Sequence, residues 1–219
     1  MAITRRVFVS GSMAAPLVAQ LAGAGAANAA GEQTLTALDG LAELRLTDLA
    51  LKRLAGQGIG VHAVDPATPI LDTDGATVGV KLTPEYAGGT ILATGQPGKG
   101  SGRAHGGVVL SNSRARMEIT DIRGSVPDGV ILAFLKVNDV WLGELSLFSS
   151  DPSAVRLSLQ PGTPGQPILV SCNGIPVTPT QEGVDEFANA FGTALFTTKD
   201  TVFTASGHGN AWPVPSFPA

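Results

Sequence analysis

The sequence has few cysteines and few charges. Its 219 residues include one cysteine, Cys172, and 15% of them are charged, with a formal net charge of −4. A single cysteine excludes an intramolecular disulfide, so the fold depends on packing. The acidic balance and the lack of a Lys/Arg-rich run exclude a basic nucleic-acid footprint and a polybasic membrane contact. After the N-terminal apolar stretch no run approaches 18 residues, so we expect no integral membrane segment in the mature chain.

The sequence also lacks the local motifs of common enzymes and metal sites. It contains no G-x-S-x-G nucleophile motif, and His62, His105 and His208 do not have the spacing of a zinc motif. The glycine-rich stretch 95–103 lacks the GK[ST] ending of a phosphate-binding loop, and strand-like sequence flanks it, which favours an inter-strand loop. We therefore expect no catalytic residues and no metal ligands. The alternative is an exported hydrolase whose catalytic residues are dispersed over loops.

The N-terminal residues have the three parts of a signal peptide. Arg5 and Arg6 form a basic start, an Ala- and Gly-rich apolar stretch follows, and a small-residue site ending at Ala29 allows cleavage before Ala30. The paired arginines resemble the signal of the twin-arginine export route. We expect residues 1–29 to be removed and the mature protein to be secreted or associated with the cell envelope. Its formal charge becomes −6, because two arginines and no acidic residue are lost.

One segment near the middle of the N-terminal half has the pattern of a short helix. It runs over residues 47–55, and either Thr47 or Asp48 can cap its N-terminus. Gly56 can end the helix in the left-handed conformation.

A second helix is expected in the C-terminal part of the chain. The stretch 178–181 (TPTQ) has the capping-box spacing, with Thr178 as N-cap and Pro179 at the first helical position. Gly192 would end the helix. Its apolar face recurs at i, i+3, i+4 and i+7 and consists of Val184, Phe187, Ala188 and Phe191.

The rest of the chain alternates with a period of two. Residues 77–82 and 114–122 each place apolar side chains on one side, which is typical of antiparallel sheets. In the second segment Met117, Ile119 and Asp121 fall on the same side. Hairpin turns are expected at Asn138-Asp139, Asn173-Gly174 and Lys199-Asp200.

These patterns predict an all-β fold, an antiparallel β-sandwich or a sheet closed on itself, with about nine or ten short strands and two short helices. We adopt the β-sandwich as the prediction. A single domain over residues 30–206 suits the length of the mature chain. Residues 207–219 are rich in Pro and Gly and are expected to form a tail that is dispensable for folding.

Three stretches carry a family resemblance. They are LRLTDLALKRLAGQGIGVHAVDPAT (44–68), RAHGGVVLSNSRARMEITDIR (103–123) and GIPVTPTQEGVDEFANAFGTALFTTKDTVFTAS (174–206). Across residues 44–206 the chain resembles the HtaA-like domains of secreted and cell-surface proteins of high-GC Gram-positive bacteria.

The resemblance implies a β-sandwich with two short helices and, as ligand, haem. In haem-binding members a tyrosine from the N-terminal helical region ligates iron, supported by a histidine in the central block. His105 falls on the position of that histidine, whereas residues 48–55 contain no tyrosine. Tyr86 is the one tyrosine of the chain, and a tyrosine oxygen is an accepted haem ligand. The resemblance makes His105 a candidate contact for haem, and Tyr86, which lies outside the family's position for the tyrosine, is the second candidate. The alternative is a binding or structural domain without haem or any other cofactor.

The expected function is that of a secreted, non-enzymatic binding or interaction domain of the bacterial cell envelope. Its partner would be a small ligand such as haem or an unknown envelope protein. The dispersed hydrolase is one alternative. The other is a purely structural envelope protein that docks on a partner through Trp212 and the tail.

Overall fold

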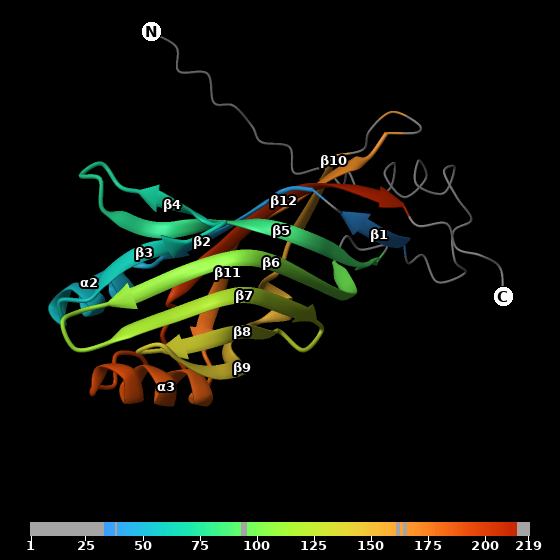
Figure 1. Ribbon diagram of the computed structural model, residues 1–219. Helices are drawn as coiled ribbons and strands as arrows, with labels where there is room; N and C mark the ends of the chain where they lie inside the picture. The colour runs from blue at the N-terminus through green and yellow to red at the C-terminus, as the bar shows by residue number, and fades with distance from the viewer. Residues whose placement is uncertain (1–32, 38, 93–95, 161–162, 164–165, 214–219) are drawn as a thin grey trace, which may run out of the picture.

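The computed structural model describes residues 33–37, 39–92, 96–160, 163 and 166–213. Arg5, Arg6, Ala29 and the expected cleavage site lie outside these residues. Antiparallel strands and two short α-helices make up the chain (Figure 1), which confirms the predicted all-β class. Within the described residues there are twelve strands, somewhat more than the nine or ten expected.

The elements follow one another with short connections. The strands are β1 (Gln33–Ala37), β2 (Leu41–Leu46), β3 (Gly60–Val64), β4 (Thr68–Leu71), β5 (Thr77–Ile91), β6 (Pro97–Ser111), β7 (Arg116–Val126), β8 (Val130–Val137), β9 (Val140–Ser150), β10 (Leu157–Gln160), β11 (Ile168–Pro179) and β12 (Phe203–Pro213). The helices are α2 (Asp48–Gly56), α3 (Gln181–Phe191) and the 3-10 turn η1 (Pro152–Ala154).

The order of hydrogen-bonded strands closes on itself. Eight strands follow one another as β12-β2-β5-β6-β7-β8-β9-β11, and β11 pairs again with β12. β1 pairs with both β5 and β12 beyond the start of β2, while β3 pairs with β6, β4 with β5 and β10 with β11. Every pairing is antiparallel, so short turns suffice to connect neighbouring strands.

One of the three predicted hairpins is confirmed. β8 and β9 are joined at Asn138 and Asp139, whose φ angles of 47° and 67° belong to the left-handed region that a two-residue hairpin turn requires. The prediction at Asn173-Gly174 is wrong, because this dipeptide is a bulge inside the continuous strand β11, with Gly174 at φ 71°. β12 pairs with β11 on both sides of the bulge, so the extra residues are absorbed without a reversal of the chain.

Two other segments differ from expectation. The glycine-rich stretch 97–103 is the first half of β6 and pairs with β5 on one side and β7 on the other. Residues 195–197 are not a strand, and the turn that follows is held by Asp200, whose carboxylate accepts from the Thr197 amide at 2.7 Å. The third expected hairpin is therefore a turn that leads into β12.

Both helices begin after a threonine N-cap. The Thr47 hydroxyl accepts from the Ala50 amide at 3.3 Å, which confirms the start of α2. The prediction that Gly56 ends the first helix in the left-handed conformation is wrong, because Gly56 is the last residue of α2 and Gln57 is the C-cap at φ −106°. Helix α3 begins two residues later than predicted, because Pro179 still belongs to β11 and Thr180 is the N-cap. Gly192 ends α3 at φ 72°, as expected.

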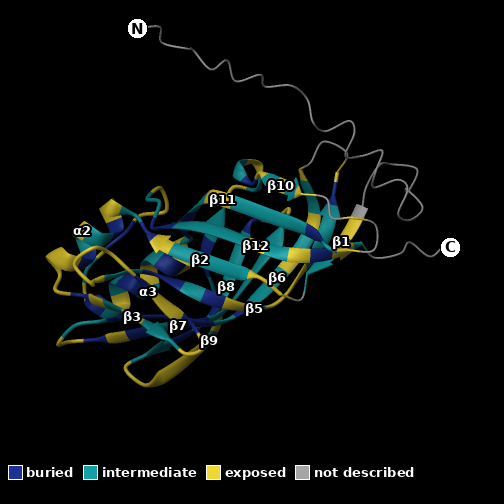
Figure 2. Cartoon of the chain, turned by 90° about the horizontal axis from the view of Figure 1, so that it is seen from above, coloured by how far each residue is buried: buried dark blue, intermediate teal, exposed yellow. Residues whose placement is uncertain are grey.

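The interior contains two hydrophobic clusters. The main cluster joins α2 and α3 to the strands around them, and its largest fully buried members include Leu54, Leu110, Met117, Phe187 and Phe196. The minor cluster consists of Leu35, Ile91, Ile168 and Ala211. Figure 2 shows that fully buried positions gather near α2 and α3, whereas the strands toward β1 are mostly of intermediate burial.

Strand β12 extends past the predicted domain boundary. Residues 207–213, expected to belong to a tail, pair with β11, β2 and β1, and Ala211 is a member of the minor cluster. Trp212 lies in this strand opposite Thr36. Glycine at 207 and 209 suits a strand here because the neighbouring backbone of β2 and the β1–β2 connection approaches closely. Among the described residues, no helix has the length and apolar character needed to span a bilayer.

Candidate functional site

Three neighbouring strands carry a bulge at the same level of the sheet. β5 is irregular between Pro84 and Tyr86, β6 between Ala104 and Gly107, and β7 between Thr120 and Arg123. The residues at these bulges include Glu85, His105, Gly106 and Asp121. Asp121 has a φ of 49°, which is uncommon for a residue with a side chain. Bulges re-aim side chains and are frequent beside functional sites.

The re-aimed side chains form one polar group, the His105 cluster, which consists of Glu85, Arg103, His105 and Asp121. His105 Nδ1 lies 2.8 Å from Asp121 Oδ1, and His105 Nε2 lies 3.4 Å from Glu85 Oε2. Arg103 bridges the same two carboxylates, with Nε 3.3 Å from Glu85 and Nη2 3.9 Å from Asp121. The imidazole therefore lies between two carboxylates.

Stability alone does not explain this cluster. Its four side chains are between 33% and 42% exposed, and ion pairs exposed to this degree contribute little to folding. Asp121 adopts a strained backbone conformation to join it. Because the partly exposed ion pairs do not offset the backbone strain at Asp121, we interpret this face as a functional surface.

Tyr86 lies on the same face as this cluster. In the register of β5 and β6, Tyr86 is opposite Arg103 and Thr83 is opposite His105. Directly opposed residues share a face, and diagonal neighbours are about 7–8 Å apart, within reach of aromatic side chains. Tyr86 is 37% exposed. The register thus places the two candidates from the sequence, Tyr86 and His105, at diagonal positions on one face, on either side of the β5 bulge.

Sequence reasoning did not identify the other members of the cluster. The period of two placed Asp121 on the side of Met117 and Ile119, both of which are buried. A charged residue on a predicted apolar face was the available signal for an irregular strand. His62 and His208 lie elsewhere, on β3 and β12. The described part of the chain contains no group of three or more His, Cys, Asp or Glu side chains placed to hold a metal ion.

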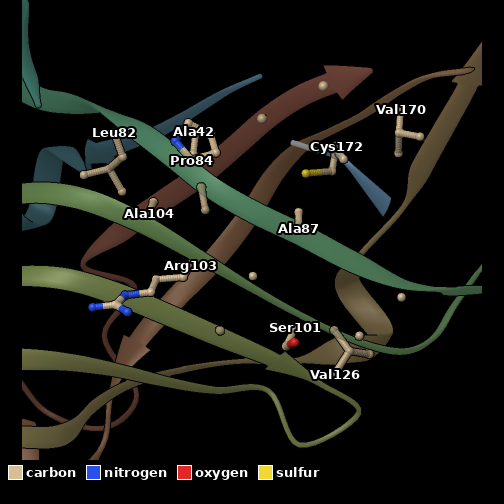
Figure 3. Close-up of a pocket in the computed structure, with 18 of the residues that line it drawn as sticks. Ala42, Leu82, Pro84, Ala87, Ser101, Arg103, Ala104, Val126, Val170 and Cys172 are labelled. Atoms are coloured by element: carbon tan, nitrogen blue, oxygen red, sulfur yellow. The ribbon is translucent and has the colours of Figure 1, made fainter. Parts of the chain in front are cut away.

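A second feature is a cavity of about 470 Å³ between the strands of the ring, which is partly open to solvent. Its lining includes members of the main cluster, such as Leu82 and Phe148, and Leu35 and Ile91 of the minor cluster, so it lies between the two. The volume is within the range of ligand sites in proteins. Figure 3 shows lining residues that come from several different strands, among them Val170 and Cys172 of β11.

Cys172 lines this cavity and is half-buried. Burial raises the pKa of the Cys172 thiol, an effect that a backbone hydrogen bond with Gly207 opposes in part. The thiol is therefore protonated at neutral pH, and a protonated thiol is a poor nucleophile and a poor metal ligand.

Comparison with known proteins gives a result at the level of fold. No protein-family model matches the sequence, and the search of curated proteins finds no match. The solved C-terminal domain of HtaA from Corynebacterium glutamicum superposes with a TM-score of 0.50 and 13% identity, over 81% of this chain and 99% of that one. The chain has an HtaA-like fold.

Two further structures from the same organism are similar. The haem-binding protein HtaB matches with a TM-score of 0.47 and 10% identity over 84% of this chain and 96% of its own. The N-terminal domain of HtaA matches with a TM-score of 0.43 and 15% identity over 80% and 97%. Within the HtaA-like fold of this chain, α2 carries no tyrosine and Tyr86 lies on β5.

Proposed function

We propose that this chain is a non-enzymatic binding domain of the bacterial cell envelope, exported by the twin-arginine route, which contacts haem on the outer face of β5 and β6. The observation that carries the proposal is the coincidence of three bulges that aim Glu85, His105 and Asp121 at one another on the face of Tyr86. The sequence resemblance and the HtaA-like fold support it.

Tyr86 fits haem as an iron ligand, and His105 does not. A haem iron accepts a tyrosine oxygen, and Tyr86 is exposed on the face in question. Both ring nitrogens of His105 face carboxylates, so a lone pair becomes free for iron only if one of these contacts is broken. Haem would supply an iron centre that takes an oxygen ligand. His105 would instead hold Glu85 and Asp121 in place beside it.

The same geometry opposes a hydrolase at this cluster. The contact of His105 Nδ1 with Asp121 resembles two members of a catalytic triad. In such a triad the other nitrogen must reach a serine or cysteine nucleophile. Here His105 Nε2 faces Glu85. A carboxylate occupies the position that the nucleophile would need, so binding is the better interpretation.

A hemin titration of the mature protein, followed by visible absorption, tests the proposal. We expect a saturable Soret shift in the wild type, loss of that shift in Tyr86→Phe, and severalfold weaker binding in His105→Ala, because the cluster then loses its central contact. His62→Ala is the control, since His62 is exposed on β3. A wild type without a saturable shift, or a Tyr86→Phe variant that binds as well as the wild type, would overturn it. Turnover of an ester or glycoside substrate would favour the hydrolase.

A further inference from the structure

The cavity exists because the residues that face it are small. Ala87, Gly102, Gly124 and Ile131 are direct neighbours across β5, β6, β7 and β8, and all four line the cavity. Ile131 packs against the main cluster, so this row faces the interior. A Cβ atom built on Gly124 would meet no heavy atom within 4 Å. Three of the four inward positions in this row thus carry no side chain larger than a methyl group.

Other rows around the cavity repeat the pattern. Gly89 is opposite Gly100 on β5 and β6, and on the far side Gly207 is opposite Cys172 and Gly209 is opposite Val170. Toward α2 and α3, inward positions of the same sheet carry large side chains that fill the core, such as Leu110 and Met117. The void therefore results from small residues at the inward positions of several strands, and not from a packing defect at one residue.

The cavity is elongated along β5. It is lined by β5 from Leu82 to Ile91, a length of roughly 30 Å at about 3.3 Å per residue. The space of about 470 Å³ extends along this strand, and we call it the channel. Its walls are mostly hydrocarbon, because Gly, Ala, Leu, Ile and Val supply most of the lining. An apolar molecule with a small cross-section matches such walls.

We propose that this channel holds one unbranched hydrocarbon chain, the acyl chain of a free fatty acid or of a lipid. Tyr86 belongs to the part of β5 that lines the channel, but it pairs with Arg103 on the face opposite to Ala87 and Gly102, so the proposal does not depend on haem binding. A single methylene chain can extend along the channel between the main and minor clusters. The protonated thiol of Cys172 behaves as an apolar group in such a wall.

Cys172 also provides the assay, because it is the one cysteine of the chain and lines the channel. The rate at which iodoacetamide alkylates Cys172 is measured by mass spectrometry on lipid-free mature protein. Increasing concentrations of palmitate are compared with monopalmitoylglycerol and with hemin. We expect saturable slowing of alkylation by at least tenfold with palmitate. Slowing by both acyl compounds indicates recognition of the chain alone, and slowing by palmitate only indicates a free fatty acid.

Gly124→Leu should block the channel. We expect it to retain at least tenfold less radiolabelled palmitate in equilibrium dialysis. Gly56→Leu is the matched control, because Gly56 also has no heavy atom within 4 Å of its Cβ position but lies at the end of α2. His105→Ala, at a residue outside the lining of the channel, should leave palmitate binding unchanged while it weakens hemin binding, so failure of the haem proposal is distinguishable from failure of this one.

Two results would overturn the inference. One is a wild type that neither shows palmitate-dependent protection of Cys172 nor retains palmitate in dialysis, a result that needs no variant. The other is a folded Gly124→Leu protein that retains palmitate as well as the wild type.

Discussion

Asp200 connects distant parts of the chain through a single carboxylate oxygen. Its Oδ2 accepts from Arg53 Nη1 at 2.6 Å, from the Thr197 amide at 2.7 Å and from the Thr197 hydroxyl at 2.8 Å. Arg53 also donates to the carbonyl of Leu195 at 3.0 Å. The hydrogen bond from Arg53 is the main reason that the pKa of Asp200 lies below its ordinary value. Helix α2 is thereby tied to the turn that leads into β12.

Asp200→Asn is expected to lower the free energy of unfolding at pH 7 by about 1 kcal/mol, the scale of a partly exposed ion pair with supporting hydrogen bonds. Because the folded-state pKa is depressed, the carboxylate stabilises the fold above pH of about 4, and this contribution is lost as the pH falls through the folded pKa. Urea unfolding at pH 7 and at pH of about 3 measures this effect. The difference in free energy of unfolding between the wild type and Asp200→Asn should be smaller at the lower pH.

Asp139→Asn is the control for this comparison. Asp139 pairs with Lys136 in the exposed β8–β9 turn, and asparagine tolerates its left-handed conformation. We expect no measurable change in unfolding. A difference between wild type and Asp200→Asn that persists at low pH would contradict the role given to the ionised Asp200.

The two site residues named from the sequence belong to rare residue types. Tyr86 is the one tyrosine and His105 one of three histidines, so composition and the family resemblance sufficed to select them. Glu85, Arg103 and Asp121 are common types whose importance comes from geometry. Their contacts depend on bulges in three strands, and a bulge inverts the face that a period of two assigns to a side chain.

At the scale of elements, the local sequence predicts those helices and turns whose conformation does not depend on pairing with neighbouring strands. The β8–β9 hairpin and α2 have turn and capping residues that act within a few positions. The first half of β6 was missed because glycine has a low intrinsic preference for strands. It is a strand because β5 and β7 pair with it, and a Cβ on Gly89 would lie 2.5 Å from the Lys99 carbonyl oxygen. Such close approach cannot be deduced from local sequence.

Helix α3 depends on a close contact of the same kind. A Cβ on Gly183 would overlap the carbonyl oxygen of Leu147 on β9. Gly→Ala inside a helix normally stabilises it by up to about 1 kcal/mol. At Gly183 the steric overlap reverses the sign, and we expect Gly183→Ala to destabilise the protein by about 1–3 kcal/mol. Thermal denaturation measures the effect.

The matched substitution is Gly56→Ala at the end of α2. A Cβ on Gly56 meets no heavy atom within 4 Å, so the ordinary helix preference applies and the melting temperature should stay constant or rise. If both substitutions raise the melting temperature, α3 does not pack against β9 as closely as the structure shows.

At the scale of the whole molecule, the ring of eight strands closes through β12. The sequence predicted antiparallel strands, but closure joins residues that are far apart in the chain, and no local pattern shows it. β12 pairs with β2 through His208 and with β11 as far as Ala211. The boundary of the domain was placed too early because the Gly-rich residues 207–210 resemble a tail in isolation. Their partners on β11 and β2 make them part of the sheet.

Deletion of residues 207–219 tests this closure. The truncated chain keeps the start of β12 but loses the partners of Ile168–Cys172 on β11 and of β1, and it loses Ala211 from the minor cluster. The cavity between the clusters would then lose the part of its wall that Gly207, His208, Gly209 and Ala211 supply. We expect the melting temperature to fall by about 10 °C or more, since at this chain length each kcal/mol shifts it by roughly 2–4 °C. Truncation after Pro213 removes none of these pairings and is the control. Equal melting temperatures for the two truncations would mean that the ring does not need the second half of β12.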